Sequence, residues 1–441
     1  MNRMHLRTRA GRTLTALAVS ALLAACSRDE LLAVNTPDQI TPEAAASPTG
    51  AAALRVSALG NFANLYSGDN AGGGVGLNIM SGLLTDEMTS HRGGTEHVDS
   101  RGVNENTFPS TVWSLVGTAQ TQLIRARKAL AQYGTPGATT NTQMAVLQAL
   151  EAYVYTLTAE HYCNGVPIGN ADDADPQTVN LTNAQLYTRA IASFDSALGL
   201  APASDASTRN LIAIGKARTL MNQGTTQYAA AAALVANVPN TYTYMVQHSK
   251  TTIINDVFDW MVATPNFGVV NREGGTGLDY LSANDPRISF DPAPKAGQDG
   301  SPQIRPTKYL LGDSPVELAG GIEARLIQAE AALAANNVNA FLGFLNGARA
   351  TRTDLTPLTD PGTQAARVDM LFRERAFWTW LTAHRIGDMR RLIRQYGRNA
   401  ETVFPTGAYF KGGQYGTDVN LIPSNAERNN AGFTGCADRN A

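Results

Sequence analysis

The sequence is short of the features that mark several large classes of protein. Only three of its 441 residues are cysteines, and charged residues make up 16% of the chain. Lys and Arg number 35 against 37 Asp and Glu, so the chain has no basic surplus of the kind that favours nucleic-acid binding. After residue 25, no apolar stretch approaches the roughly 20 residues that a transmembrane helix needs. These absences argue against nucleic-acid binding and against membrane-spanning helices.

Familiar catalytic and metal-binding motifs are missing as well. The sequence contains no G-x-S-x-G, no paired C-x-x-C and no H-E-x-x-H. The run 72–76 is rich in glycine, but no apolar strand precedes it, so it does not predict a phosphate-binding loop. We therefore expect a protein that is not an enzyme and that holds no metal and no cofactor.

The N-terminus predicts an exported lipoprotein. Four arginines between residues 3 and 12 precede a short apolar run, and this run ends in Leu23-Ala24-Ala25-Cys26, which resembles a bacterial lipobox. We predict that residues 1–25 are a signal peptide and that Cys26 is lipidated. Ser27 is not the aspartate that retains lipoproteins on the inner membrane, which favours the outer membrane and its cell surface. The alternative is a secreted protein in which Cys26 is an ordinary cysteine.

Lipidation of Cys26 would leave two cysteines, Cys163 and Cys436. An even remainder in an oxidising compartment allows one disulfide between them, and the alternative is two free thiols. Removing residues 1–25 removes four arginines, so 31 basic residues face 37 acidic ones and the net charge becomes about −6.

Helical periodicity dominates the rest of the chain. Residues 26–47 are predicted to be a lipidated tether and residues 48–441 a single domain. Thr182 and Gln185 predict a capping box at the start of one helix. Amphipathic helices are predicted over 112–130, 147–157, 182–198, 211–221, 228–236, 322–333 and 338–345. Paired in sequence, they predict a mostly α fold of tetratricopeptide-like hairpins.

The segment 240–320 differs in character, because Gly, Pro, Asn and Asp cluster between short aromatic or β-branched runs. It is predicted to be a loop-rich insertion with a short hairpin. The polar segment 412–430 is expected to wrap over the helices.

The segment 370–391 places charged residues within an apolar seam if it is one continuous helix. His384 and Asp388 would then form an i, i+4 pair, and an enzyme could use His384 as a base oriented by Asp388. We favour a structural role for Glu374, His384, Arg385 and Asp388, because the sequence shows no nucleophile or metal set nearby.

These motifs, in their order, resemble the SusD/RagB family of nutrient-binding outer-membrane lipoproteins. Glu374-Arg375, His384-Arg385 and the run 388–391 match a C-terminal family stretch, although Thr382-Ala383 replace its usual Glu-Gly. The family's other motifs are matched by the runs 34–38, 165–167, 326–333 and 346–349.

The resemblance implies a SusD-like fold with four helical hairpins and a loop-rich ligand face. It implies that the protein is a surface lid on a SusC-like TonB-dependent channel. The lid would capture a glycan or a peptide and pass it to the channel. The only contact with the membrane would be the lipid anchor.

Sugar binding needs flat apolar rings beside planar polar groups, and two loop regions offer them. The candidate ligand-binding residues are His91, Arg92, Trp113, Trp260 and Tyr280. Burial in the core is the competing interpretation for each of the aromatics. Tyr409, Phe410 and Tyr415 lie among glycines and could also face a ligand or the channel.

Two other functions remain open. A helical-repeat scaffold would bind other envelope proteins and no small ligand, but it would have little use for some 80 residues of aromatic-bearing loops. A glycosidase would need two carboxylates roughly 5–10 Å apart in one cleft, and the sequence gives no such pair a visible context.

Overall fold

A computed structural model describes residues 46–69, 75–104, 110–169, 179–430 and 432–441. The predicted signal peptide, the lipidation site Cys26 and nearly all of the tether lie outside these residues. The described residues belong to one compact unit, Ala46–Ala441.

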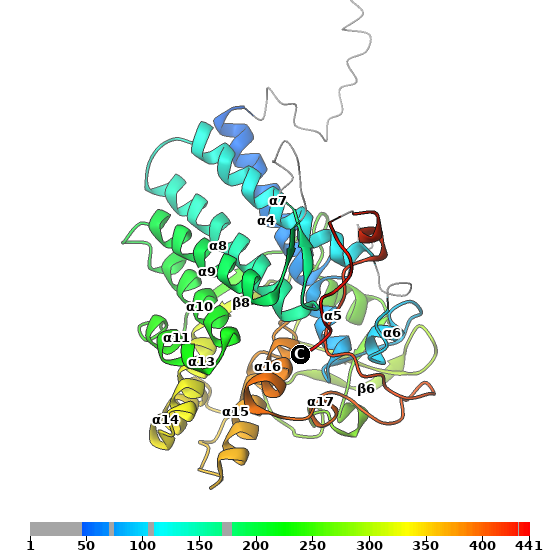
Figure 1. Cartoon of the computed structure of the whole chain (residues 1–441). Coiled ribbons are helices and arrows are strands. Elements are labelled where there is room, and N and C mark those ends of the chain that lie inside the picture. The colour runs from blue at the N-terminus through cyan, green and yellow to red at the C-terminus, as the bar shows by residue number, and fades with distance from the viewer. Residues whose placement is uncertain (1–45, 70–74, 105–109, 170–178, 431) are drawn as a thin grey trace, which may run out of the picture. The chain divides into compact units, whose positions relative to one another are not determined.

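A layer of paired helices forms one side of this unit (Figure 1). Successive helices pack against one another, α4 on α7, α7 on α8, α8 on α9 and so on to α13 on α14. The tetratricopeptide-like helical hairpins predicted from the sequence are therefore confirmed. Their bounds are α4 (Pro48–Ser67), α7 (Ser110–Tyr133), α8 (Ala138–His161), α9 (Asn183–Leu200), α10 (Ala206–Gln223), α11 (Tyr228–Leu234), α13 (Gly321–Ala334) and α14 (Val338–Arg349).

Local sequence explains how these helices begin. The predicted capping box opens α9, because the Thr182 hydroxyl accepts from the Gln185 N–H and the Gln185 side chain accepts from the Thr182 N–H. The same helix buries Phe194, whose ring meets the edge of Tyr153 on α8 with centroids 5.3 Å apart. Each helix thus buries its apolar face against its neighbour in the layer.

The other side of the unit is made of loops, short helices and two-stranded sheets. Its helical pieces are α5 (Leu77–Leu84), α6 (Glu96–Asp99), α12 (Asp256–Phe258), the π-helical turn η3 (Asp259–Ala263), η4 (Glu273–Gly275), α17 (Ala400–Val403) and η5 (Asn425–Asn429). A further single turn, η2 (Thr225–Gln227), joins α10 to α11 in the helical layer.

Four antiparallel strand pairs organise the connections. β4 (Thr243–Val246) pairs with β8 (Val316–Gly320), so the two ends of the loop-rich segment lie together where it leaves the helical layer. The hairpin expected within that segment is β6 (Phe290–Ala296) with β7 (Pro302–Pro306). The other pairs are β1 (Met88–Ser90) with β5 (Phe267–Val269), and β2 (Val166–Ile168) with β3 (Val179–Leu181).

The segment 370–391 is not one helix, which corrects the sequence prediction. α15 (Gln364–Trp378) and α16 (Arg385–Tyr396) are separated by a turn in which Leu381 and Ala383 have φ of 56° and 57°. Side chains from the N-terminal helices bind the turn: Asn78 donates to the Leu381 carbonyl at 2.8 Å. Tertiary hydrogen bonds of this kind offset the strain of a left-handed backbone at residues other than glycine.

The predicted His384–Asp388 side-chain pair is therefore absent. Asp388 instead accepts from Arg375 and from Arg391 at 2.9 Å, and all three side chains are buried. Burial alone would raise the pKa of Asp388, but the two guanidinium charges outweigh it and hold that pKa below its ordinary value. This geometry gives His384 no carboxylate orienter on its own helix.

The other three residues of the predicted structural set are also buried in polar contacts. Glu374 accepts from Arg287 and Arg349 at 2.8 and 2.7 Å. Arg385 donates to Asp86 at 2.6 Å. The His384 ring nitrogens contact Thr382 and Arg218. These contacts join the C-terminal helices to both sides of the unit.

The C-terminal segment crosses the end of α8 and is held there covalently. Cys163 and Cys436 form the predicted disulfide, with their Cα atoms 5.9 Å apart. Backbone hydrogen bonds flank it, from Cys163 N to Leu421 O and from Ala437 N to Asn164 O, each 2.8 Å long. The tail is thus fixed at two points beside the disulfide.

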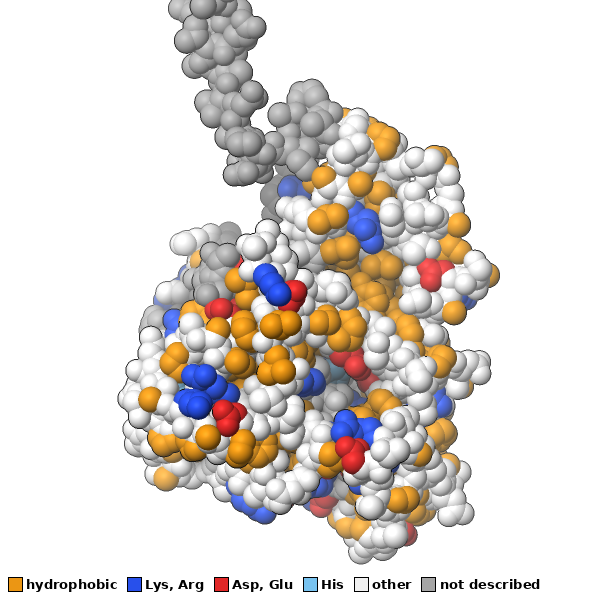
Figure 2. Space-filling view, turned by 180° about the vertical axis from the view of Figure 1, so that it is seen from behind, with side chains coloured by type: hydrophobic (Ala, Val, Ile, Leu, Met, Phe, Trp, Pro, Cys, Tyr) orange, Lys and Arg blue, Asp and Glu red, His pale blue; other side chains and the backbone are white. Residues whose placement is uncertain are grey.

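Within the described residues, none of the helices combines the length and the apolar character needed to cross a bilayer. The same residues contain no cluster of three or more His, Cys, Asp or Glu side chains placed to hold a metal ion. In Figure 2, acidic, basic and apolar side chains are interspersed over the visible face.

Candidate ligand-binding face

Two of the predicted ligand-binding residues meet in the loop-rich part. β1 pairs with β5 so that Ser90 lies opposite Phe267, and this pairing brings the loop after β1 to the π-helical turn η3. The Arg92 guanidinium there lies over the Trp260 ring, 4.6 Å from its centroid. Both side chains are half-buried, so an aromatic ring and a planar cation share one partly exposed surface.

His91, the neighbour of Arg92, has a structural position instead. Its ring is 1% exposed, and Nδ1 lies 2.8 Å from the Ser301 hydroxyl. Its carbonyl accepts from Asp299 N at 3.0 Å, so it ties the loop after β1 to the β6–β7 hairpin. Burial lowers the pKa of the imidazole against the opposing effect of Asp299. His91 therefore does not reach a ligand in this structure.

The turn 407–416 contributes an exposed ring and a cation to the same neighbourhood. Lys411 binds Asp299 at 2.6 Å and also lies 3.5 Å from Glu96. Phe410 is 52% exposed, and the Lys411 ammonium lies 5.5 Å from its ring centroid. Among the described residues, Phe410 is the one aromatic side chain that is largely exposed. We call the set Arg92, Glu96, Trp260, Asp299, Phe410 and Lys411 the loop face.

Two buried carboxylates hold this turn by hydrogen bonds to its tyrosines. The Tyr409 hydroxyl donates to Asp99 at 2.7 Å, and the Tyr415 hydroxyl donates to Glu273. Burial raises the pKa of Asp99 to about 6 and that of Glu273 to about 8, the latter with a contribution from the charge of Asp99. The Tyr409 ring meets the edge of Phe410 at 4.9 Å, so the exposed ring is held by a fixed neighbour.

The other two predicted residues are in the core. Trp113 is 5% exposed, packs edge-on against Tyr162 at 4.8 Å, and donates its indole N–H to Glu427. Tyr280 is fully buried and lies 5.2 Å from the Phe377 ring centroid. Neither side chain is available to a ligand in this structure.

The sequence analysis missed Glu96, Asp299 and Lys411 as members of this face. Each is a common type of surface residue, and only the tertiary contact of Lys411 with both acids sets them apart. A weak signal was the sequence 409–413, in which two aromatic residues and a lysine precede two glycines.

A smaller hollow of about 280 Å³ lies where β8 approaches the end of α15. Its lining includes Lys308, Glu317, Glu323 and His384, so charges of both signs face it. The Lys308 ammonium already donates to the Trp380 carbonyl. Its lysine is thus already bound within the protein, and its volume lies just below the usual range for a small-molecule site, which makes it a weaker candidate than the loop face.

Comparison with known proteins identifies the fold. The sequence matches no family model and no curated protein, whereas many solved structures are similar. A surface glycan-binding protein A from Bacteroides uniformis aligns with a TM-score of 0.68 over 88% of this chain and 99% of its own, at 13% identity. A SusD superfamily protein from Bacteroides fragilis gives a TM-score of 0.67 over 90% and 100%, also at 13% identity.

The chain has the SusD fold. A laminarin-binding SusD-like protein covers 89% of this chain with 99% of its own, at a TM-score of 0.64 and 14% identity. The structures therefore confirm the predicted resemblance at the level of architecture. At these identities the likeness concerns the SusD fold and does not transfer ligand-binding residues.

Proposed function

We propose that the protein is a nutrient-binding lipoprotein of the outer membrane that captures a glycan at the loop face. The observation that carries this proposal is the exposed ring of Phe410 beside Lys411 and the Arg92–Trp260 stack. An exposed ring can stack on the apolar face of a pyranose, while cations and carboxylates beside it bind hydroxyl groups. The SusD fold supports the proposal, because solved structures that share it are described as carbohydrate-binding, glycan-binding or laminarin-binding proteins.

The proposed role is binding and delivery without bond cleavage. We propose a SusC-like TonB-dependent channel as the partner that receives the glycan, and a position at the cell surface. The loop-rich part favours ligand capture over a pure scaffold, because a scaffold would need only the helical layer. A peptide is the second candidate ligand, since Lys411 and Asp299 could equally bind peptide groups.

Replacing Phe410 by alanine should weaken glycan binding by about tenfold or more. Burying one aromatic side chain contributes roughly 1.5–3 kcal/mol, and each 1.4 kcal/mol is about tenfold in affinity. The measurement is a titration of the purified protein with a panel of oligosaccharides and peptides, followed by tryptophan fluorescence, because Trp260 lies on the loop face.

Val56→Ala is the control, because Val56 is 65% exposed on α4 in the helical layer. It should bind the selected glycan like the unmodified protein. If only peptides bound saturably, the ligand of the loop face would be a peptide and the glycan proposal would be wrong. Equal affinity of Phe410→Ala and the unmodified protein for a bound glycan would remove the loop face as its site.

The proposed anchor has a separate test. Cys26→Ser should release the protein from the outer membrane or leave its signal peptide attached, because the thiol that carries the lipid is gone. Membrane fractionation and mass spectrometry of the N-terminus measure both outcomes. A variant that still fractionated with the outer membrane like the unmodified protein would exclude the lipid anchor.

A further inference from the structure

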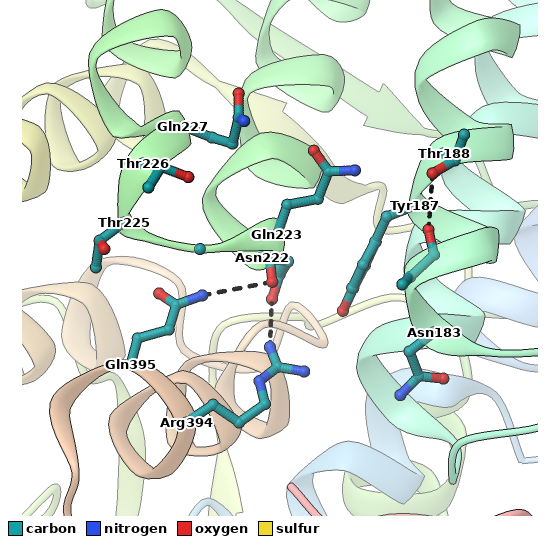
Figure 3. A pocket seen from close by; sticks show the side chains of 12 residues that line it. Asn183, Tyr187, Thr188, Asn222, Gln223, Thr225, Thr226, Gln227, Arg394 and Gln395 are labelled. Carbon is teal, nitrogen blue, oxygen red and sulfur yellow. Dashed lines mark hydrogen bonds between the residues drawn. The ribbon is translucent and has the colours of Figure 1, made fainter.

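A cleft of about 660 Å³ lies in the helical layer, away from the six residues of the loop face. The first two turns of α9 form one wall, and the end of α10, the α10–α11 connection and the end of α16 form the other (Figure 3). Its volume is that of an ordinary small-molecule site. The lining residues are Asn183, Ala184, Tyr187, Thr188, Asn222, Gln223, Gly224, Thr225, Thr226, Gln227, Arg394 and Gln395.

The lining is polar but carries no acid. Amides and hydroxyls make up most of it, and Arg394 is its only charged residue. In the described part of the chain, Arg394 forms no ion pair. Its exposed side chain donates to the Asn222 side chain over 3.4 Å and also interacts with the Tyr187 hydroxyl. Figure 3 shows this guanidinium extended into the space between the two walls. A positive charge without a counter-ion in a polar cleft favours an anionic ligand.

A second cation strengthens this bias. Arg390 lies one turn earlier on α16, and its guanidinium donates to backbone carbonyls, including those of Ala159 and Glu160. Burial, together with the charge of Arg394, lowers the pKa of Arg390 to about 10. Arg390 thus adds a second positive charge behind the cleft, which the charges of Glu160 and Asp438 partly offset.

Tyr187 brings a buried hydroxyl to the same place. Its side chain is 3% exposed, burial raises the pKa of the hydroxyl, and the nearby Arg394 guanidinium opposes that effect. In Figure 3 the ring stands at the edge of the cleft, and the hydroxyl points toward the side where Arg394 and Asn183 lie. The N-terminal end of the 18-residue helix α9 adds a partial positive charge on the same wall.

We propose that this cleft is a second binding site, for a small polyhydroxylated carboxylate such as a uronic acid. Arg394 would pair with the carboxylate, and the Tyr187 hydroxyl and the threonines and amides of the walls would bind the hydroxyl groups. The site is separate from the loop face and does not depend on the function proposed for it.

Isothermal titration of the full protein with D-galacturonate, D-galactose and acetate tests the site. Galacturonate should bind at least tenfold more tightly than either of the others, because only it offers both the charge and the hydroxyls. Arg394→Gln should weaken galacturonate about tenfold or more, since a charge-assisted hydrogen bond is lost. Tyr187→Phe should weaken it severalfold.

Val56→Ala, at an exposed position of α4 outside the cleft and the loop face, is the control and should leave galacturonate binding unchanged. Thr226→Val provides a second cleft variant at an exposed position, and it should weaken binding without altering the fold. Equal affinity for galactose or acetate would overturn the proposal. Unchanged galacturonate binding in both Arg394→Gln and Thr226→Val would overturn it as well, whatever the loop face is found to bind. Digalacturonate as a further ligand shows whether the cleft takes a free uronate or the end of an acidic glycan.

Discussion

Replacing Asp388 by alanine should lower the free energy of unfolding by about 3–5 kcal/mol, because it leaves two buried guanidinium groups without their shared carboxylate. Arg375 and Arg391 both donate to Asp388 at 2.9 Å, and each is less than 5% exposed. Arg391 would keep Glu330 at 2.6 Å, whereas Arg375 has Asp388 as its one ion-pair partner among the described residues. Chemical denaturation of both proteins measures the difference.

Asp360→Ala is the control for this prediction. Asp360 also binds an arginine in bidentate fashion, Arg367 at 2.7 Å, but that pair lies at the surface. Solvent screens such pairs, so the control should unfold like the unmodified protein. A loss of stability no larger in Asp388→Ala than in the control would show that the buried network does not stabilise the fold.

Removing the Cys163–Cys436 disulfide should be the other large change. The bond closes a loop of 273 residues, and the chain-entropy estimate for a loop of this size is about 5–6 kcal/mol, an upper figure. The double variant Cys163→Ser/Cys436→Ser should therefore melt at a lower temperature and expose the tail to protease. Thermal unfolding and limited proteolysis measure the two effects.

Reductant supplies the matched comparison. Adding it should lower the melting temperature of the unmodified protein toward that of the double variant and leave the double variant unchanged. Two free thiols in protein purified without reductant, detected by mass spectrometry, would contradict the bond. The fold would survive that result, because backbone hydrogen bonds from Cys163 and Ala437 also hold the tail.

The helical layer could be predicted because its signals are local. Apolar residues repeat at helical spacing along each helix, and the Thr182–Gln185 capping box marks the start of α9. Helix ends were less certain. The helix predicted over 147–157 in fact extends over Ala138–His161. Its first turns could not be predicted, because they hold threonines and Asn141 in place of an apolar pattern.

The break between α15 and α16 could not be predicted in this way. Leu381 and Ala383 adopt left-handed backbone conformations, and neither residue type favours them. The stabilising partner, Asn78, is 303 residues away from Leu381 in the sequence. Local propensity therefore predicted one helix where long-range hydrogen bonds impose a turn.

The candidate site shows the same limit. An aromatic residue in a loop-rich segment can face the core or the solvent, and no periodicity decides between them. Tyr280 is in the core, whereas Trp260 meets Arg92 because β1 pairs with β5. The cleft that contains Arg394 could not be predicted from the sequence, since its residues come from α9, the α10–α11 connection and α16.

Hydrogen exchange with and without a bound glycan tests the central claim most directly. The account predicts that the glycan selected by titration slows exchange in residues 91–96 and 407–416, and that Phe410→Ala removes this protection. Exchange in α13 and α14, which lie in the helical layer, should stay unchanged. Protection confined to the helical layer, with none at the loop face, would contradict the account.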